Sequence, residues 1–273
     1  MKLNSRQSGL TLTETTVVVA SAAMLAVFAL PAVRAFMNSF EVQGGAKAMI
    51  SAGLASARAI AAREQRYAGV RFQKIYSDSG DPLKVAQYMI FIVYDFDKIG
   101  LKNGFRAIEG IEPIKLPDSV GVMDLMVRID HGTGSSAAEE PNDRTIDADS
   151  LIDDPEELRD TTAFSILFSP SGKLIIHDVR TRNRDGKFKP SDPDESMDDI
   201  FNSSENIRDY STGMFVQDDY ADLGLGAEPS RNSFIIYNRT LFAKINENNR
   251  WSDYLKDLEF IYINPYTGTI IDR

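Results

Sequence analysis

The chain contains no cysteine, and this absence excludes three kinds of chemistry. Without cysteine there is no disulfide framework, no thiolate metal site and no cysteine nucleophile. Basic residues are in deficit as well, because 30 Lys and Arg stand against 40 Asp and Glu, for a net charge of −10. Nucleic-acid binding relies on a basic patch with interleaved aromatic residues, and the sequence has none. We therefore predict no nucleic-acid partner.

Histidine is also scarce, with two in the whole chain. His131 follows Asp130, and His177 precedes Asp178. Neighbouring residues on a strand point to opposite faces, so neither dipeptide predicts a catalytic His–Asp pair. The glycine-rich run at residues 132–136 lacks the lysine of a phosphate-binding loop. We expect a chain that is not an enzyme.

The most informative segment is an apolar run near the start of the chain. It follows a short basic leader with Lys2 and Arg6, and residues 15–33 carry no charge. About 20 apolar residues at 1.5 Å each cross a hydrocarbon core of about 30 Å. The sequence thus predicts a membrane-spanning helix over residues 10–35. The positive-inside rule places the N-terminus in the cytoplasm and the rest of the chain on the other side.

A single acidic residue, Glu14, interrupts this apolar run. A carboxylate inside a membrane segment costs roughly 2.5–3.5 kcal/mol on insertion scales and normally marks a function with a specific partner. Near the start of the helix the cost is smaller, because the carboxylate can reach the interface. Glu14 therefore distinguishes this segment from a plain signal anchor.

The N-terminal pattern comprises a basic leader ending in Gly9, an apolar Leu10, Glu14 four residues later, and Pro31 late in an apolar helix. As a set, these residues resemble the type IV pilin and type II secretion pseudopilin family. The resemblance implies that prepilin peptidase cuts between Gly9 and Leu10 and methylates the new amine of Leu10. It also implies that Glu14 meets the N-terminal amine of a neighbouring subunit and that Pro31 kinks the helix. Family members most often have phenylalanine at the position of Leu10.

Beyond residue 35 the helix is predicted to continue to Tyr67. Its apolar residues recur at spacings of 3 and 4, which is one face of an amphipathic helix. These residues are Val42, Ala46, Met49, Ile50, Leu54, Ala57, Ile60 and Ala61. The Ala- and Arg-rich helix end at 54–63, the strand at 69–72, the turn at 168–174 and a closing strand after Gly268 are similar to GspH/FimT-type minor pseudopilins.

From residue 69 onward the pattern changes to strands and turns. We predict strands over residues 70–75, 85–94, 120–129, 163–169, 173–179, 234–243, 258–263 and 269–271. Asn103-Gly104 is a hairpin turn signal. Two polar stretches, at 131–160 and 180–226, lack periodicity and are predicted to be long acidic loops.

The expected fold is α+β. A leader at residues 1–9 is followed by a long helix at 10–67, which packs on an antiparallel β-sheet head at 68–273. The expected function is that of a minor pseudopilin or minor pilin assembled into a type II secretion pseudopilus or type IV pilus. The expected partners are prepilin peptidase, other pilin or pseudopilin subunits, the inner-membrane assembly platform and membrane lipid. The chain would be a single-pass inner-membrane protein with a periplasmic head, and later part of a periplasmic or extracellular filament.

Two alternatives remain open on the sequence. A membrane-anchored periplasmic binding or enzymatic domain would use the helix as a plain signal anchor. A secreted soluble protein would be cut near Ala35, where Val33-Arg34-Ala35 offers a small-x-small cleavage site.

One acidic run is a candidate metal site, and it consists of Asp192, Asp194, Glu195, Asp198 and Asp199. Oxygen ligands at alternating positions suit Ca²⁺, and some major pseudopilins bind calcium in a C-terminal loop. The run lacks the spacing of an EF-hand loop with its glycine and terminal glutamate. We therefore interpret it as a solvated loop and expect no cofactor, with calcium as the alternative.

Overall fold

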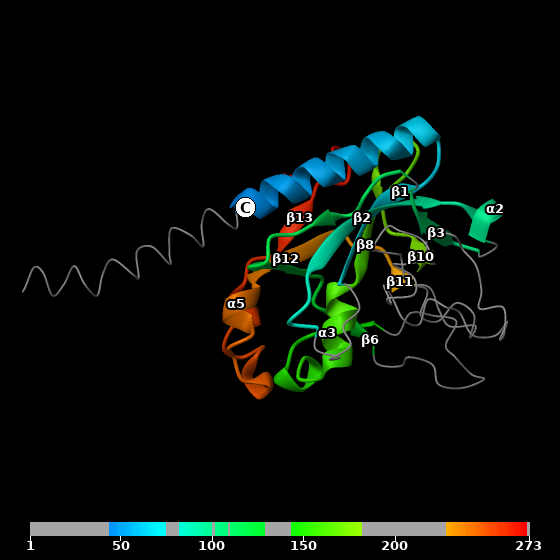
Figure 1. Ribbon diagram of the computed structural model, residues 1–273. Coiled ribbons are helices and arrows are strands. Elements are labelled where there is room, and N and C mark those ends of the chain that lie inside the picture. The colour runs from blue at the N-terminus through cyan, green and yellow to red at the C-terminus, as the bar shows by residue number, and fades with distance from the viewer. Residues whose placement is uncertain are drawn as a thin grey trace, which may run out of the picture. The chain divides into compact units, whose positions relative to one another are not determined.

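The computed structural model describes residues 44–74, 82–99, 102–108, 110–128, 143–181 and 228–271 (Figure 1). The chain divides into two units, Met1–Gly44 and Gly45–Arg273, and every described strand belongs to the second unit. The predicted leader and membrane segment, with Gly9, Leu10, Glu14 and Pro31, lie outside the described residues. Within the described residues, no helix is both long and apolar enough to cross a membrane.

The fold is α+β, with mostly antiparallel sheets and few helices. The main sheet has eight strands in the order β11-β10-β3-β2-β1-β8-β9, with β4 paired to β2. Among these strands, β10 and β3 are parallel and the other pairs are antiparallel. The strands are β1 (Ala68–Lys74), β2 (Gln87–Tyr94), β3 (Gly104–Ala107), β4 (Ile114–Lys115), β8 (Phe164–Phe168), β9 (Leu174–Ile175), β10 (Asp178–Thr181) and β11 (Glu228–Pro229).

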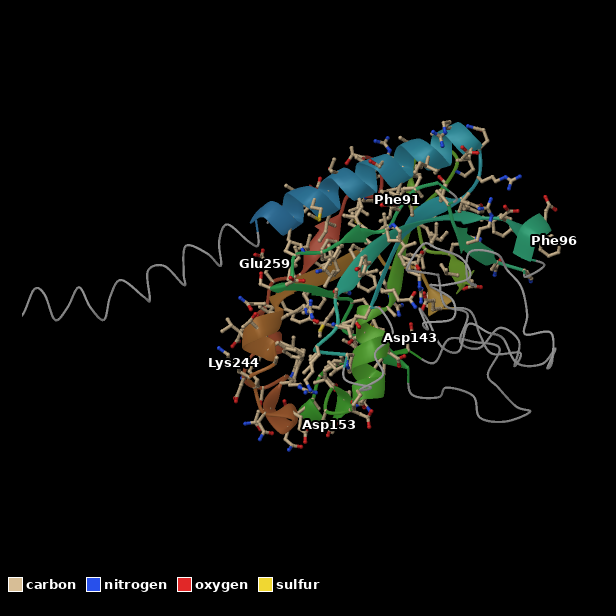
Figure 2. All side chains as sticks on the ribbon, viewed as in Figure 1. Phe91, Phe96, Asp143, Asp153, Lys244 and Glu259 are labelled. Atoms are coloured by element: carbon tan, nitrogen blue, oxygen red, sulfur yellow. The ribbon has the colours of Figure 1, made fainter. Side chains whose placement is uncertain are left out.

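A helix described over residues 44–64 lies across one face of the main sheet, over β1, β2 and β8 (Figure 1). The sheet register puts Val70, Phe91 and Ile166 side by side on one face, and Phe91 lies beneath the helix (Figure 2). Gly53 lets the helix come close, because a Cβ there would be 2.4 Å from Met89 Cε. The predicted apolar helix face is confirmed, since six of its residues are buried: Ala46, Ile50, Leu54, Ala57, Ile60 and Ala61.

A second, four-stranded sheet has the order β14-β13-β12-β5. Its strands are β5 (Val120–Met123), β12 (Ser233–Asn238), β13 (Ile261–Ile263) and β14 (Ile270–Ile271). A separate two-stranded ladder joins β6 (Met126–Arg128) to β7 (Asp143–Thr145). The helices nearby are α3 (Pro155–Thr162), α5 (Arg239–Phe242) and the 3-10 turns η1 (Asp149–Leu151), η3 (Glu247–Asn249) and η4 (Leu255–Asp257).

These elements enclose a core of their own, which we call the second core. Its buried residues are Met123, Leu125, Val127, Ile146, Ile152, Leu158, Ile235, Tyr237, Phe242 and Leu255. Trp251 packs against this core from outside. The described unit therefore contains a main sheet covered by a helix, and a second core built from residues 123–158 and 235–255.

The side chain of Gln87 connects the main sheet to the second one. Gln87 is fully buried in β2. Its Nε2 donates to the carbonyls of Val122 and Thr162, each at 2.8 Å, and its Oε1 accepts from Val122 N at 2.8 Å. Since β5 is the last strand of the four-stranded sheet, the amide takes the place of a neighbouring strand at this edge.

The predicted loop at 131–160 is wrong over its described part. Residues 143–160 contribute β7, η1 and most of α3, and Ile146, Ile152 and Leu158 are buried in the second core. These three apolar residues are separated by acidic stretches, so they show no local periodicity. Their burial depends on partners more than 70 residues later in the chain, such as Ile235 and Leu255.

Two predicted strands also change course. The strand expected over 120–129 breaks at Asp124-Leu125, where Leu125 has φ of 56°, and its halves join different sheets as β5 and β6. The strand expected over 234–243 ends at Asn238, whose side chain accepts from Leu241 N at 3.0 Å and caps α5.

The strand predicted over 173–179 is wrong as one strand, because residues 174–175 form β9 beside β8 whereas residues 178–179 begin β10 beside β3 and β11. The strands predicted over 70–75, 85–94, 163–169, 258–263 and 269–271 are confirmed in position, with bounds that differ by a few residues. Asn103 has φ of 60° and immediately precedes β3. However, the link from β2 to β3 contains a short helix, α2 (Phe96–Ile99), so the predicted tight hairpin is wrong. The loop predicted over 180–226 lies outside the described residues from 182 onward.

Candidate assembly surface

The helix is fastened to two distant turns by a single arginine. Arg58 Nε donates to the carbonyl of Gly172 at 2.8 Å, and its Nη1 donates to the carbonyl of Thr267 at 2.9 Å. Gly172 and Gly268 have φ of 76° and 69°, which favours glycine. At Gly268 a Cβ would also lie 2.8 Å from Phe168 Cε1. We call this meeting of helix and turns the Arg58 junction.

The two turns of the Arg58 junction also contact each other. Leu174 N donates to the carbonyl of Pro265 at 2.8 Å, which joins β9 to the β13–β14 turn. Lys173 Nζ lies 5.9 Å from the centroid of the exposed Tyr266 ring. The helix end, the 168–174 turn and the turn before the closing strand thus meet in one place.

A second set of contacts fixes the C-terminal end of the helix. Asp95, at the end of β2, has a side chain that is 4% exposed and lies between two arginines. Arg106 Nε is 2.6 Å from Asp95 Oδ2, and Arg66 Nη1 is 3.5 Å from Asp95 Oδ1. Tyr94 N donates to the carbonyl of Tyr67 at 2.8 Å. The helix is therefore held to the sheet both at Arg58 and just beyond its end.

The opposite side of the helix is exposed and carries small side chains. We call this the outer stripe: Gly45, Ala48, Ala52, Ala55, Ala59 and Ala62. Their spacings alternate between 3 and 4, which keeps them on one side of a helix over several turns. Small residues let two helix backbones approach closely. The outer stripe is thus a surface on which a second helix can lie.

A buried polar cluster lies on the sheet face opposite the helix. Arg71 Nε donates to Gln73 Oε1 at 2.6 Å, and its Nη1 donates to Ser165 Oγ at 3.1 Å and forms an ion pair with Glu228. The side chains of Arg71 and Glu228 are 5% and 9% exposed. Because buried charges are costly unless paired, this cluster holds edge strand β11 against the sheet. Sequence analysis missed it, since alternating polar residues in β1 predict exposure rather than burial.

The structure separates the side chains of the His177-Asp178 dipeptide. His177 Nδ1 lies 2.6 Å from the backbone carbonyl of Asp178, whereas the Asp178 carboxylate lies 3.3 Å from Asn103 Nδ2. The His177 ring packs between Tyr67 and Phe105, with centroid distances of 4.8 and 6.1 Å. The arrangement serves packing and does not orient the imidazole for acid–base chemistry.

The other sequence candidates belong to parts of the chain outside the described ranges. Asp130, His131, the glycine-rich run at 132–136 and the acidic run at 192–199 lie outside the described residues, as do Gly9, Leu10, Glu14 and Pro31. Within the described ranges, no group of three or more His, Asp or Glu side chains could hold a metal ion. In comparisons with known proteins, no family model, no curated protein and no solved structure matches this chain.

Proposed function

We propose that this chain is a pilin-like structural subunit, a minor pseudopilin or minor pilin. It is processed by prepilin peptidase and assembled into a type II secretion pseudopilus or type IV pilus. The observation that carries the proposal is the N-terminal pattern of Gly9, Leu10 and Glu14 in front of an uncharged apolar run. A plain anchor has no need of an acidic residue at a place where it is costly.

The charge of Glu14 gives the assembly step a physical reason. In the apolar interior of a helix bundle, a carboxylate is stabilised only by a close positive partner. The methylated amine of Leu10 in a neighbouring subunit supplies that charge at the same depth. Pairing of Glu14 with this amine therefore selects the register in which a new subunit joins.

The outer stripe supports the proposal from the described part of the chain. A helix whose other face is buried on its own sheet has the stripe left for contact with neighbours. The small side chains of Ala52, Ala55 and Ala59 allow close helix packing without rearrangement of the sheet. The contacts of Arg58 and Asp95 keep the helix and the main sheet in a fixed relation, so that the helix sets the orientation of the head.

The first test is the mature N-terminus, determined by intact mass and N-terminal peptide sequencing of protein from native membranes. The expected chain starts at methylated Leu10. A start at Met1 would contradict the proposal and favour a membrane-anchored periplasmic domain. A start near Phe36 would contradict it in favour of a secreted soluble protein.

The second test separates assembly from processing. Glu14→Ala should still be cut after Gly9 but should be lost from the filament fraction, because its carboxylate no longer meets a neighbouring amine. Ala55→Leu should also reduce incorporation, because it fills the outer stripe. Lys244→Leu is the control, since Lys244 is exposed after α5 and does not belong to the helix. Equal incorporation of the two leucine variants would argue against the stripe as an assembly surface.

A further inference from the structure

Three charged side chains meet where the two-stranded ladder leaves the four-stranded sheet. Asp124 follows β5, Asp143 begins β7, and Arg231 precedes β12 (Asp143 is labelled in Figure 2). Arg231 Nε lies 2.7 Å from Asp124 Oδ2, and Arg231 Nη2 forms an ion pair with Asp143 Oδ2. The side chains of Asp124, Asp143 and Arg231 are 1%, 8% and 17% exposed. One guanidinium thus faces two buried carboxylates.

The charges in this cluster do not balance. Burial alone would lower the pKa of Arg231, but the charges of Asp124 and Asp143 outweigh it and raise that pKa, so the guanidinium stays positive. Two ionised carboxylates then leave one net negative charge in a poorly solvated place. Asp124 Oδ1 accepts from Met126 N at 2.9 Å. Asp143 Oδ1 is buried and has no hydrogen-bond partner within the described residues.

The surroundings of Asp124 favour uptake of a proton. Burial raises the pKa of Asp124 to about 7 against the opposing effects of Arg231 and the Met126 amide, and the charge of Asp143 adds to the rise. Among the described side chains, Arg231 and Asp143 are the charged groups that face it. The contact between Asp124 and α3 is made by backbone groups, since Asp124 N donates to the carbonyl of Thr161 at 3.0 Å.

The cluster lies where it can control the attachment of the ladder. Asp124 stands beside Leu125, whose carbonyl accepts from Ile146 N at 2.9 Å and so extends the β6–β7 pairing. Val127 and Ile146 bury their side chains in the second core. Arg231 N also donates to the carbonyl of Ser165 at 2.7 Å in β8. The cluster therefore joins the ladder to both sheets.

We propose that Asp124, Asp143 and Arg231 form a pH-dependent cluster, which we call the clasp, that holds the β6–β7 ladder in its packed position. With a proton on Asp124, the cluster is neutral and the β6–β7 ladder stays paired and packed on the second core. With both carboxylates charged, their repulsion is relieved by opening, and the ladder opens more readily. The proposal stands on the described side chains alone and does not depend on the pilin-like function.

The direction of the pH effect follows from linkage. In the opened ladder the Asp124 carboxyl is solvated and titrates near the ordinary pKa of about 3.9. The closed state keeps its proton to higher pH, so closure is strongest at low pH and weakens as pH rises toward 7. For one proton, the change is at most about tenfold per pH unit in the opening equilibrium, and it levels off above that range.

Hydrogen exchange of the full-length chain in detergent, between pH 5 and 8, tests the clasp. Rates are converted to protection factors, which removes the intrinsic pH dependence of exchange. Peptides covering Val127 and Ile146 should lose protection by up to about tenfold per pH unit between pH 5 and 7. Peptides of β1 should show no such slope, because β1 lies outside the cluster.

Two substitutions complete the test. Asp124→Asn keeps the shape and removes the group that takes up the proton, so the slope in the ladder should fall below about twofold per pH unit. Asp147→Asn is the control, because Asp147 is 67% exposed and its neutralisation should leave the slope unchanged. A flat wild-type profile, or a slope that persists in Asp124→Asn, would overturn the proposal. If Asp124→Asn does not fold, the wild-type comparison of the ladder with β1 still decides.

Discussion

Replacing Gln87 with methionine tests whether one buried amide joins the two sheets. Methionine is close to glutamine in size, so the change removes hydrogen bonds without leaving a large cavity. The groups that lose their partner are Val122 N, the carbonyl of Val122 and the carbonyl of Thr162. A buried backbone group without a partner costs about 1–3 kcal/mol. Because the thioether is a weak acceptor for Val122 N, we expect the low end, a loss of about 3 kcal/mol in the free energy of unfolding.

Urea denaturation followed by tryptophan fluorescence measures this loss. The chain has one tryptophan, Trp251, which packs against the second core and reports on its unfolding. Gln65→Met is the matched control, because Gln65 is exposed and water replaces the bond from its Nε2 to Ala62. The control should stay within about 0.5 kcal/mol of the wild type. A loss below about 1 kcal/mol for Gln87→Met would refute the reasoning, since it would mean that the amide contacts contribute little.

Two further substitutions test the Arg58 junction by the same assay. Arg58→Ala should lower the free energy of unfolding by about 1–3 kcal/mol, because it removes two charge-assisted hydrogen bonds at a partly exposed site. Its control, Arg63→Ala, should change the free energy of unfolding by less than about 0.5 kcal/mol, because Arg63 is 69% exposed. Equal effects of the two substitutions would contradict the role assigned to Arg58. Gly268→Ala should cost about 2–4 kcal/mol through left-handed strain and contact with Phe168. Gly110→Ala should cost only about 1–2 kcal/mol, since its φ is 79° but the space around it is open, and a larger loss there than at Gly268 would contradict the packing argument.

The elements that could be predicted from sequence are those whose buried residues follow a regular pattern within the element itself. The strands β2 and β8 are dense in apolar and β-branched residues, β1 alternates apolar with polar residues, and the helix has one continuous apolar face. In each case the residues that share a face are close in sequence. Local periodicity is then sufficient to predict the element and its buried face, because the surface on which that face packs only has to be apolar.

Helix α3 was missed although it carries a local signal. Asp154, Pro155 and Glu157 stand at the positions of a capping residue, a first-turn proline and a capping-box glutamate, and Glu157 Oε2 accepts from Asp154 N at 3.1 Å. The acidic composition of the surrounding stretch suggested a solvated loop. What made it a core element was the apolar surface supplied by residues 235–255, and no short window of sequence contains both.

The Arg58 junction was only half predictable. The resemblance selected its three segments, but it gave no reason for them to meet. Arg58 reaches partners that are 114 and 209 residues away in sequence, and a lone arginine on an alanine-rich helix predicts a solvated side chain. The two glycines with positive φ were visible as turn signals, whereas the carbonyls that they present to Arg58 were not.

The balance of charge in the buried clusters indicates which contacts should respond to pH. At the end of the helix, Asp95 faces two arginines, Arg66 and Arg106, so its negative charge is more than matched. At Arg231 the ratio is reversed, because one guanidinium serves both Asp124 and Asp143. Burial raises the pKa of Asp124, and the charge of the second acid at this site adds to the rise, so protonation near neutral pH is favoured here. We therefore expect the pH response to be confined to the cluster at Asp124, while the contacts of Asp95 that hold the end of the helix do not respond. Exchange profiles that were flat at Asp95 and sloped at Asp124 would fit this division, whereas a slope at both would mean that charge balance does not govern it.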